Sequence, residues 1–172
     1  MNRLLSLKIL IILISLLPLQ ACTSTGYTTG SNFDHSISSI AVPIFQNDTL
    51  QRGLEVQLAE SLNKEIRART PWALSKSDHA ETSLIGIITS HTIRQLSQAP
   101  GTGLVQEQTV RITINFEWRD NRTGNILVAR NNFAATSTFV PQRGIGQRIE
   151  QGQREAIEEL AKDVISQLRQ SW

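Results

Sequence analysis

The residue types that carry most enzyme chemistry are sparse in this sequence and are not arranged as a site. Three histidines, His35, His79 and His91, lack the spacing that metal ligands take. No serine stands in a nucleophile elbow, and neither a phosphate-binding loop nor an HExxH segment occurs. The pair Glu158-Glu159 fits a solvated helix surface. The sequence therefore predicts a protein that is not an enzyme and that has no cofactor and no bound metal.

Cys22, the one cysteine, offers a different kind of chemistry. A single thiol cannot form a disulfide within the chain. Before it stand Arg3, Lys8 and an apolar run over residues 9–17. This arrangement is typical of a secretory signal, and the run is too short to span a bilayer comfortably. A retained membrane anchor and an unmodified free thiol are the alternatives, and both fit the position less well.

Residues 19–22 resemble the lipobox of bacterial lipoproteins. Leu19, Ala21 and Cys22 match the pattern that the signal peptidase recognises, and Gln20 departs from the small or apolar residue usual there. The resemblance implies cleavage before Cys22, a diacylglycerol on its sulfur and a third acyl chain on its amino group. Three chains exceed the two that stable membrane anchoring requires. Thr23, in place of an aspartate that often retains lipoproteins at the inner membrane, favours the periplasmic face of the outer membrane.

The charge balance limits the classes of partner. The chain has 17 basic and 15 acidic residues, and the two basic residues of the signal leave with it. The mature chain is therefore balanced and lacks the basic patch that nucleic-acid binding requires, so no nucleic-acid partner is predicted. We expect a signal peptide over 1–21, a lipidated flexible tether over 22–36 and a single domain over 37–172.

Alternating hydrophobicity predicts the strands. The clearest covers 104–119, where strict alternation indicates one buried face and one wet face. Its apolar positions are Val110, Ile112, Ile114, Phe116 and Trp118, and its polar positions are Thr109, Arg111, Thr113, Asn115, Glu117 and Arg119. Further strands are expected over 37–45, 82–98 and 126–139, and 72–74 is compatible with a short one. Pro43 favours an edge or an end for the first strand.

Two amphipathic helices complete the expected fold. Leucine and isoleucine recur every fourth residue over 51–69, and Asp48 or Thr49 can cap this helix. The second helix is expected over 147–170. Two such helices can cover one face of a sheet and leave the other polar. The sequence therefore predicts an α+β two-layer sandwich, with two amphipathic helices on one face of a four-stranded, mostly antiparallel sheet.

Dispersed positions along the mature chain carry a family resemblance. They are residues 40–49, 53–55, 65–71, 86–88, 111–119, 122–124 and 155–157. With the order of the elements, they resemble the LptE family of outer-membrane lipoproteins, which act in lipopolysaccharide assembly. The resemblance covers the whole mature chain and implies a fold of two helices on a four-stranded sheet.

The resemblance also implies partners. Family members sit in the lumen of the outer-membrane barrel LptD, plug it, help it assemble and contact lipopolysaccharide. The lumen of a large barrel is polar, so the wet face of strand 104–119 could meet its wall, although it could equally meet water. Lipid A carries phosphates, and an arginine near a strand end or loop suits them. The candidate lipopolysaccharide contacts are Arg94, Arg122 and Arg143.

The opening stretch of the domain is also similar to the CsgG and LpoB class. These outer-membrane lipoproteins form a secretion channel or activate a periplasmic peptidoglycan synthase. The sequence has no extra pair of long alternating hairpins to build a channel wall, so the synthase activator is the stronger of the two alternatives. Co-purification of a barrel or of a synthase separates the two families.

Overall fold

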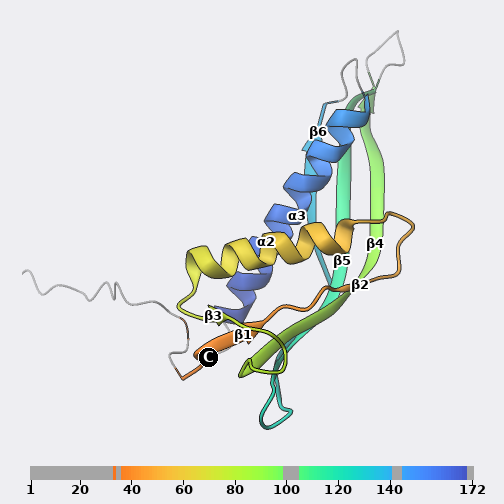
Figure 1. The fold of residues 1–172 in the computed structure, drawn as a ribbon. Coiled ribbons are helices and arrows are strands. Elements are labelled where there is room, and N and C mark those ends of the chain that lie inside the picture. The colour runs from red at the N-terminus through yellow and green to blue at the C-terminus, as the bar shows by residue number, and fades with distance from the viewer. Residues whose placement is uncertain (1–32, 34–35, 99–104, 141–144, 170–172) are drawn as a thin grey trace, which may run out of the picture. The chain divides into compact units, whose positions relative to one another are not determined.

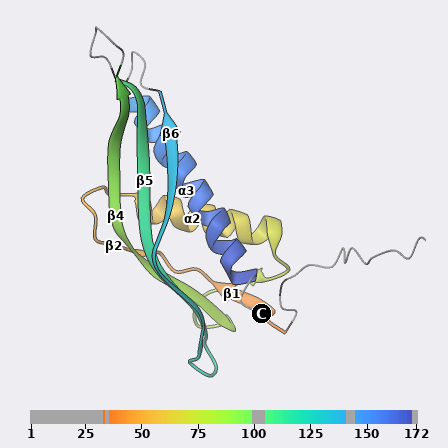
Figure 2. The ribbon, with the colours of Figure 1, turned by 180° about the vertical axis from the view of Figure 1, so that it is seen from behind.

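The fold positions two helices on one side of a long, bent sheet (Figures 1 and 2). The computed structural model describes residues 33, 36–98, 105–140 and 145–169. The strands are β1 (Ser39–Ala41), β2 (Gln46–Asn47), β3 (Ala73–Leu74), β4 (Thr82–Gln98), β5 (Val105–Asp120) and β6 (Ile126–Phe139). The helices are α2 (Leu54–Arg69) and α3 (Ile145–Arg169). Two helices and a mixed α+β class are therefore confirmed.

The sheet has six strands in place of the predicted four. Its order is β3-β1-β4-β5-β6, and β2 pairs with β4 off this path. Strands β4, β5 and β6 are antiparallel, whereas β1, β2 and β3 are held by parallel pairing. The mostly antiparallel description is therefore correct only for the three long strands. The strand–helix–strand unit β1–α2–β3 produces the parallel part, because parallel neighbours require a crossover connection.

The predicted strand over 37–45 is divided. Pro43 has no amide hydrogen to donate to a ladder, so β1 ends at Ala41 and the chain pairs with β4 again only at β2. The break also changes which side chains are buried. Ile44 does not continue the apolar alternation of this stretch and is 64% exposed.

Strand β5 organises the core as its alternation predicts. Its five alternating apolar side chains, from Val110 to Trp118, are at most 4% exposed and face the helices. Trp118 packs against Trp72, with ring centroids 5.0 Å apart, and Phe33 packs edge-to-face against Trp72 at 5.1 Å. Phe33 thus belongs to the packed core although it lies in the stretch expected as a tether. Among the described residues, neither helix has the length and apolar composition that a membrane crossing requires.

Helix α2 begins later than predicted and without the predicted cap. Its N-cap is Gly53, whose φ of 87° lies in the left-handed region, and no side chain caps the helix. Neither Asp48 nor Thr49 takes that role. The Glu55 carboxylate instead accepts hydrogen bonds from the Gly53 amide at 3.1 Å and from the Asn47 side-chain amide at 2.7 Å. Hydrogen bonds from its own main chain and from Asn47 lower the pKa of Glu55.

Two of the pairing shifts between the long strands, one on β4 and one on β6, change which side chains lie on which face. On β4 the pairing shifts between Ile88 and Ser90, so Ile88 faces the helices below the shift, whereas His91 does so above it. On β6 the extra residues lie beside Asn115, whose Oδ1 accepts from the Asn132 amide at 2.8 Å. Asn132 has a φ of 54°, and this hydrogen bond helps to hold it.

Gly86 is expected to be intolerant of substitution. A Cβ there would lie 2.5 Å from the Asn115 carbonyl oxygen and 2.5 Å from the Phe45 ring. Gly86→Ala should lower the free energy of unfolding by about 1–3 kcal/mol because the added methyl overpacks the core. Urea unfolding measures this change, and Ser90→Ala, on the same strand, is the matched control. If Gly86→Ala lowers the free energy of unfolding by the same amount when Phe45 is already replaced by Leu, the Phe45 ring does not clash with the added methyl.

The carboxylate of Glu81 is expected to make stability depend on pH. It accepts from the Ser38 amide at 2.7 Å and so joins the start of β1 to β4, and this hydrogen bond is the main cause of its lowered pKa. A lowered pKa in the folded state stabilises above the ordinary value of 4.5, and this contribution is lost as the pH falls through the folded pKa. Glu81→Gln should therefore lower the melting temperature at pH 7.

The control for this prediction is Glu60→Gln, on the exposed surface of α2. The difference in melting temperature between Glu81→Gln and the natural chain should shrink below pH 4.5, the ordinary pKa of this carboxyl. A difference that stays constant from pH 7 to pH 3 would contradict the assignment to this carboxylate.

Candidate functional site

The candidate site is the sheet face that the helices leave uncovered, which we term the bare face. It carries the six polar residues of β5 that were predicted to face a barrel. These residues, Thr109, Arg111, Thr113, Asn115, Glu117 and Arg119, are half-buried or exposed and alternate with the buried row of β5. The prediction that they share one face, away from the helices, is confirmed. What they contact stays a prediction.

Part of the bare face is already occupied by internal hydrogen bonds. Arg119 donates to the Glu117 carboxylate two residues along the same strand. Asn115 supports the bulge of β6. These side chains are therefore partly satisfied within the domain. Towards the other end of β5, Thr109 and Arg111 line a hollow.

This distal hollow lies between the three long strands near the end of the sheet drawn at the top of Figure 1. It is lined by Thr92, Arg94 and Leu96 of β4, Thr109 and Arg111 of β5, and Thr136 of β6. In the strand register, Arg94 lies opposite Thr109 and Thr92 lies opposite Arg111. The two arginines are therefore diagonal neighbours on one face, close enough for both to reach a single ligand.

The charge of the distal hollow is positive. Arg94 and Arg111 are exposed, and within the described residues neither forms an ion pair. Two guanidinium groups beside threonine hydroxyls suit a phosphate or carboxylate, to which arginine donates in a bidentate manner. Leu96, 57% exposed, adds an apolar surface at the same place. The arrangement can bind an anion that has a hydrocarbon part.

Arg122 does not join this hollow. It lies in the turn between β5 and β6, at the end of the sheet where Thr82 pairs with Asp120. Thr82 and Arg94 are twelve residue steps apart along β4, which in an extended strand corresponds to about 40 Å. The main-chain amide of Arg122 donates to Asp120 at 2.8 Å, and this bond is the largest cause of the lowered pKa of Asp120. The charge of Arg122 also lowers the pKa of Asp120 and of Glu81, so nearby carboxylates already balance this arginine.

The remaining predicted site residues lie outside the described residues. They are Leu19, Ala21 and Cys22 of the lipidation signal and Arg143 of the loop before α3. Among the candidate lipopolysaccharide contacts, only Arg94 is therefore placed in a hollow. Arg111 was predicted to face a barrel wall, and its position beside Arg94 was not foreseen, because it depends on the β4 bulge.

His79 and His91 lie apart from the distal hollow, and His35 lies outside the described residues. His79 is exposed, and its imidazole lies 3.4 Å from the Asp78 carboxylate. His91 faces the helices beside the β4 bulge, and burial lowers its pKa. In the part of the chain that the structure describes, no group of three or more His, Cys, Asp or Glu side chains could hold a metal ion.

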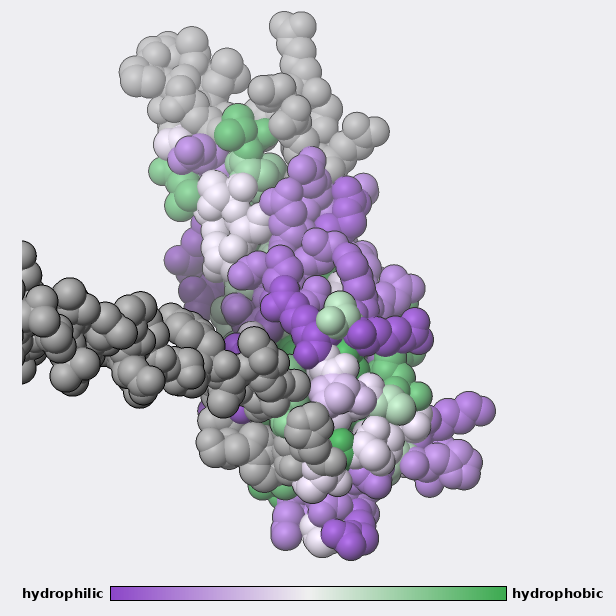
Figure 3. All heavy atoms as spheres, turned by 90° about the vertical axis from the view of Figure 1, so that its left-hand side faces the viewer, coloured by the Kyte–Doolittle hydropathy of each residue, from purple (hydrophilic) through white to green (hydrophobic). Residues whose placement is uncertain are grey.

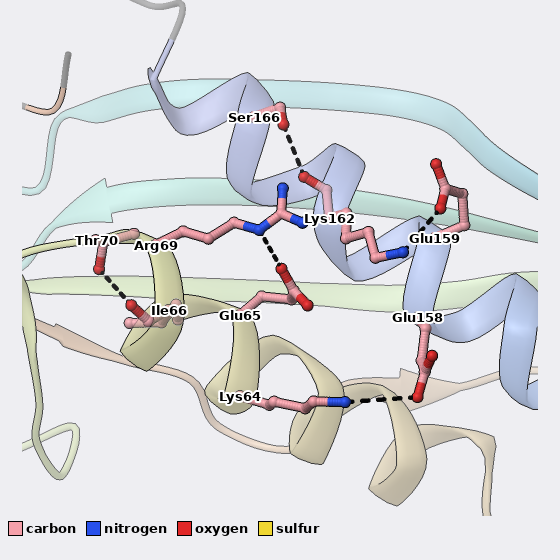
Figure 4. Close-up of polar contacts among 9 residues, drawn as sticks. All are labelled: Lys64, Glu65, Ile66, Arg69, Thr70, Glu158, Glu159, Lys162 and Ser166. Atoms are coloured by element: carbon pink, nitrogen blue, oxygen red, sulfur yellow. Dashed lines mark hydrogen bonds and ion pairs between the residues drawn. The ribbon is translucent and has the colours of Figure 1, made fainter. Parts of the chain in front are cut away.

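The helix side of the domain has a different, ion-paired surface (Figure 4). Lys64 of α2 lies 3.7 Å from Glu158 of α3, and both side chains are exposed. Glu65 is buried and pairs with Arg69 at 2.6 Å within α2. The exposed pair Lys64–Glu158 contributes little to stability, at most about 1 kcal/mol. The pairing nevertheless distinguishes this surface from the distal hollow, whose arginines have no such partner among the described residues.

The structure combines a two-layer α+β fold with a bare sheet face, and the residues that it describes form no evident reaction centre. Residues 37–170 match the family model described as "LptE: Lipopolysaccharide-assembly". The chain therefore belongs to the LptE family, whose members are non-enzymatic lipoproteins of lipopolysaccharide assembly associated with the outer membrane. No curated protein matches the sequence.

Several solved structures share the fold. Protein CT253 from Chlamydia trachomatis is 6% identical, with a TM-score of 0.54 over 77% of this chain and 96% of that chain. Protein XCC0632 from Xanthomonas campestris is 8% identical, with a TM-score of 0.54 over 81% and 90%. A PelC dodecamer from Paraburkholderia phytofirmans is 18% identical, with a TM-score of 0.50 over 81% and 95%. At these identities the similarity establishes the fold alone.

Proposed function

We propose that this chain is an outer-membrane lipoprotein that plugs an LptD-like barrel, helps it to assemble and contacts lipopolysaccharide through the distal hollow. The observation that carries the proposal is the pair Arg94 and Arg111 on the bare face, two arginines without an ion pair among the described residues. Family membership supplies the context of lipopolysaccharide assembly.

The proposed anchor is Cys22. Cleavage before this residue and acylation of its sulfur and amino group would attach the domain to the membrane through residues 22–36. Three acyl chains provide stable attachment, because two are already sufficient. The anchor would keep the domain at the periplasmic face of the outer membrane, where a barrel partner is found.

The dimensions and polarity of the sheet support the barrel partner. Strand β4 has 17 residues, and an extended strand of that length reaches up to about 55 Å. The hydrocarbon core of a bilayer is about 30 Å thick. Thr109, Thr113 and Thr136 on the bare face match the polar lumen of a large barrel. Inside a barrel the bare face would meet a polar wall, so its charged side chains would not be buried against hydrocarbon.

The partner is tested by gentle solubilisation of the tagged, full-length protein from outer membrane, followed by affinity purification and mass spectrometry. We expect a large β-barrel at equal stoichiometry. The intact mass of the purified protein reports the acyl chains on Cys22 in the same experiment. Recovery of a peptidoglycan synthase without a barrel would overturn the proposal in favour of the LpoB-like alternative. An unmodified Cys22 would overturn the proposed anchor.

The ligand site is tested by lipopolysaccharide binding to variants of the purified protein. Arg94→Ala and Arg111→Ala should each weaken binding about tenfold, because each removes a charge-assisted hydrogen bond of about 1.5 kcal/mol. Arg122→Ala is the matched control and should bind as the natural chain does, since its charge is balanced by Glu81 and Asp120. When the lipid A phosphates are removed from the lipopolysaccharide, the variants and the natural chain should bind it with the same affinity. An equal loss of lipopolysaccharide affinity in Arg94→Ala, Arg111→Ala and Arg122→Ala would contradict a site at the distal hollow.

A further inference from the structure

The distal half of the sheet has two open edges. β2 pairs with β4 only as far as Ile88. The loop of residues 48–51 lies beside Thr89–His91, and beyond His91 no described strand pairs with the outer edge of β4. On the opposite side β6 is the last strand, and within the described residues only β5 pairs with it. An open edge exposes a row of unpaired amide and carbonyl groups that another extended chain can bind.

The two edges differ in how they are protected. The pairing of β4 with β5 shifts at three places, between Ile88 and Ser90 and twice between Gln95 and Gln98, and Arg94 adds a charge. Such interruptions and charges are devices by which natural sheets avoid pairing at an edge. The segment Phe133–Phe139 of β6 pairs with β5 without any shift and contains no charged residue, proline or glycine. One edge is therefore blocked, while the other remains regular and neutral.

Helix α3 gives this neutral edge an acidic flank. The Glu155 carboxylate accepts from the Ser137 hydroxyl at 2.9 Å and from the Gln151 side chain at 3.0 Å. In the described part of the chain, no cation lies within 4 Å of Glu155. Glu159, one turn further along α3, is already paired with Lys162 at 3.2 Å, so Glu155 is the carboxylate that makes this flank acidic. In Figure 3, which shows the side of the sheet where β6 lies, a pale strip runs beside hydrophilic surface.

We infer that the outer edge of Phe133–Phe139 binds an extended segment of another protein as an added β-strand, with lysine or arginine at the positions that face α3. Main-chain hydrogen bonds to β6 would give the affinity, and the acidic flank would select the side chains. A seven-residue edge accommodates a segment of about seven residues.

A second copy of this chain fits the edge less well. Two-fold pairing of β6 with β6 would place the same surface of both copies together, so the Glu155 carboxylates would lie on the same side of a shared sheet. The segment 133–139 has no lysine or arginine to meet them. A basic segment from a different protein avoids this repulsion. The inference does not rest on the proposed function, because the added segment can come from any protein that carries this pattern.

The inference is tested in cells with the full-length lipoprotein. A photo-reactive amino acid replaces Ala134, Thr136 or Thr138 in turn, which are alternate residues on the bare-face side of β6. Cross-linked peptides are then mapped by mass spectrometry. We expect the three positions to cross-link to alternate residues of one segment of one partner, in the order that strand pairing requires. Scattered cross-links, or cross-links to a second copy of this chain, would overturn the inference.

Two pairs of variants separate edge binding from misfolding. Thr138→Lys puts a charge on the neutral edge, and we expect the ordered cross-links from position 134 to be lost. Gln95→Lys, on the already interrupted β4 edge, is its control and should retain them. Glu155→Lys should reduce the cross-links, whereas Glu150→Lys should not. All four variants should melt cooperatively. Retention of the cross-links in Thr138→Lys would overturn the inference. A mapped segment from a protein other than a barrel would sustain it while contradicting the proposed barrel partner.

Discussion

The structure depends on the burial of one row of side chains on β5. Val110, Ile112, Ile114, Phe116 and Trp118 lie at the centre of the sheet, between β4 and β6, and are almost fully removed from water. Burial of each such side chain stabilises the fold by roughly 1.5–3 kcal/mol. The two-residue period of a strand then places the intervening polar residues on the opposite face. The bare face and its arginines are therefore a direct geometric consequence of the core.

The sheet has two halves with different support. In the proximal half, β1, β2 and β3 add parallel pairing, and α2 packs on α3 near β2 and β3. In the distal half only β4, β5 and β6 remain among the described residues, and α3 packs on β5 and β6. Gly152 permits this contact, because a Cβ there would lie 2.6 Å from the Phe139 ring. The distal hollow and the neutral edge of β6 both occur where the sheet has the fewest strands and where α3, without α2, packs on it.

The sequence predicted the parts of the fold that have long, regular patterns. The alternation of β5 is uninterrupted from Thr109 to Arg119, and its buried face was recovered together with its bounds to within one residue. The short strands could not be predicted in the same way, because two residues at β2 or β3 carry no measurable period. The sequence places the start of α2 too early, because N-capping patterns assume a side chain that precedes the helix. Here the Gly53 amide donates instead to Glu55, which lies within the first turn. The order strand, helix, strand over β1, α2 and β3 is compatible with a parallel pair, which the prediction of a mostly antiparallel sheet does not include.

The candidate site was predictable only residue by residue. Arg94 could be nominated from charge and position, and Arg111 from the alternation of β5. Their proximity depends on the extra residue in β4 near Thr89, which moves Arg94 onto the bare face. A bulge cannot be recognised from the alternation of apolar and polar residues where most residues of the strand are polar. Arg122 was nominated by the same reasoning as Arg94, and only the fold shows that its neighbours are carboxylates.

The place of β1 in the sheet has a consequence for the order of folding. β4, β5 and β6 follow one another along the chain and pair as neighbours, so these contacts close short loops. β1 lies between β3 and β4, and its partners are more than thirty residues further along the chain. Contacts of such long range form slowly. The antiparallel strands β4, β5 and β6 can therefore form first. Strand β1 pairs last, so the side of the sheet that holds β1 and β3 is the final one to close.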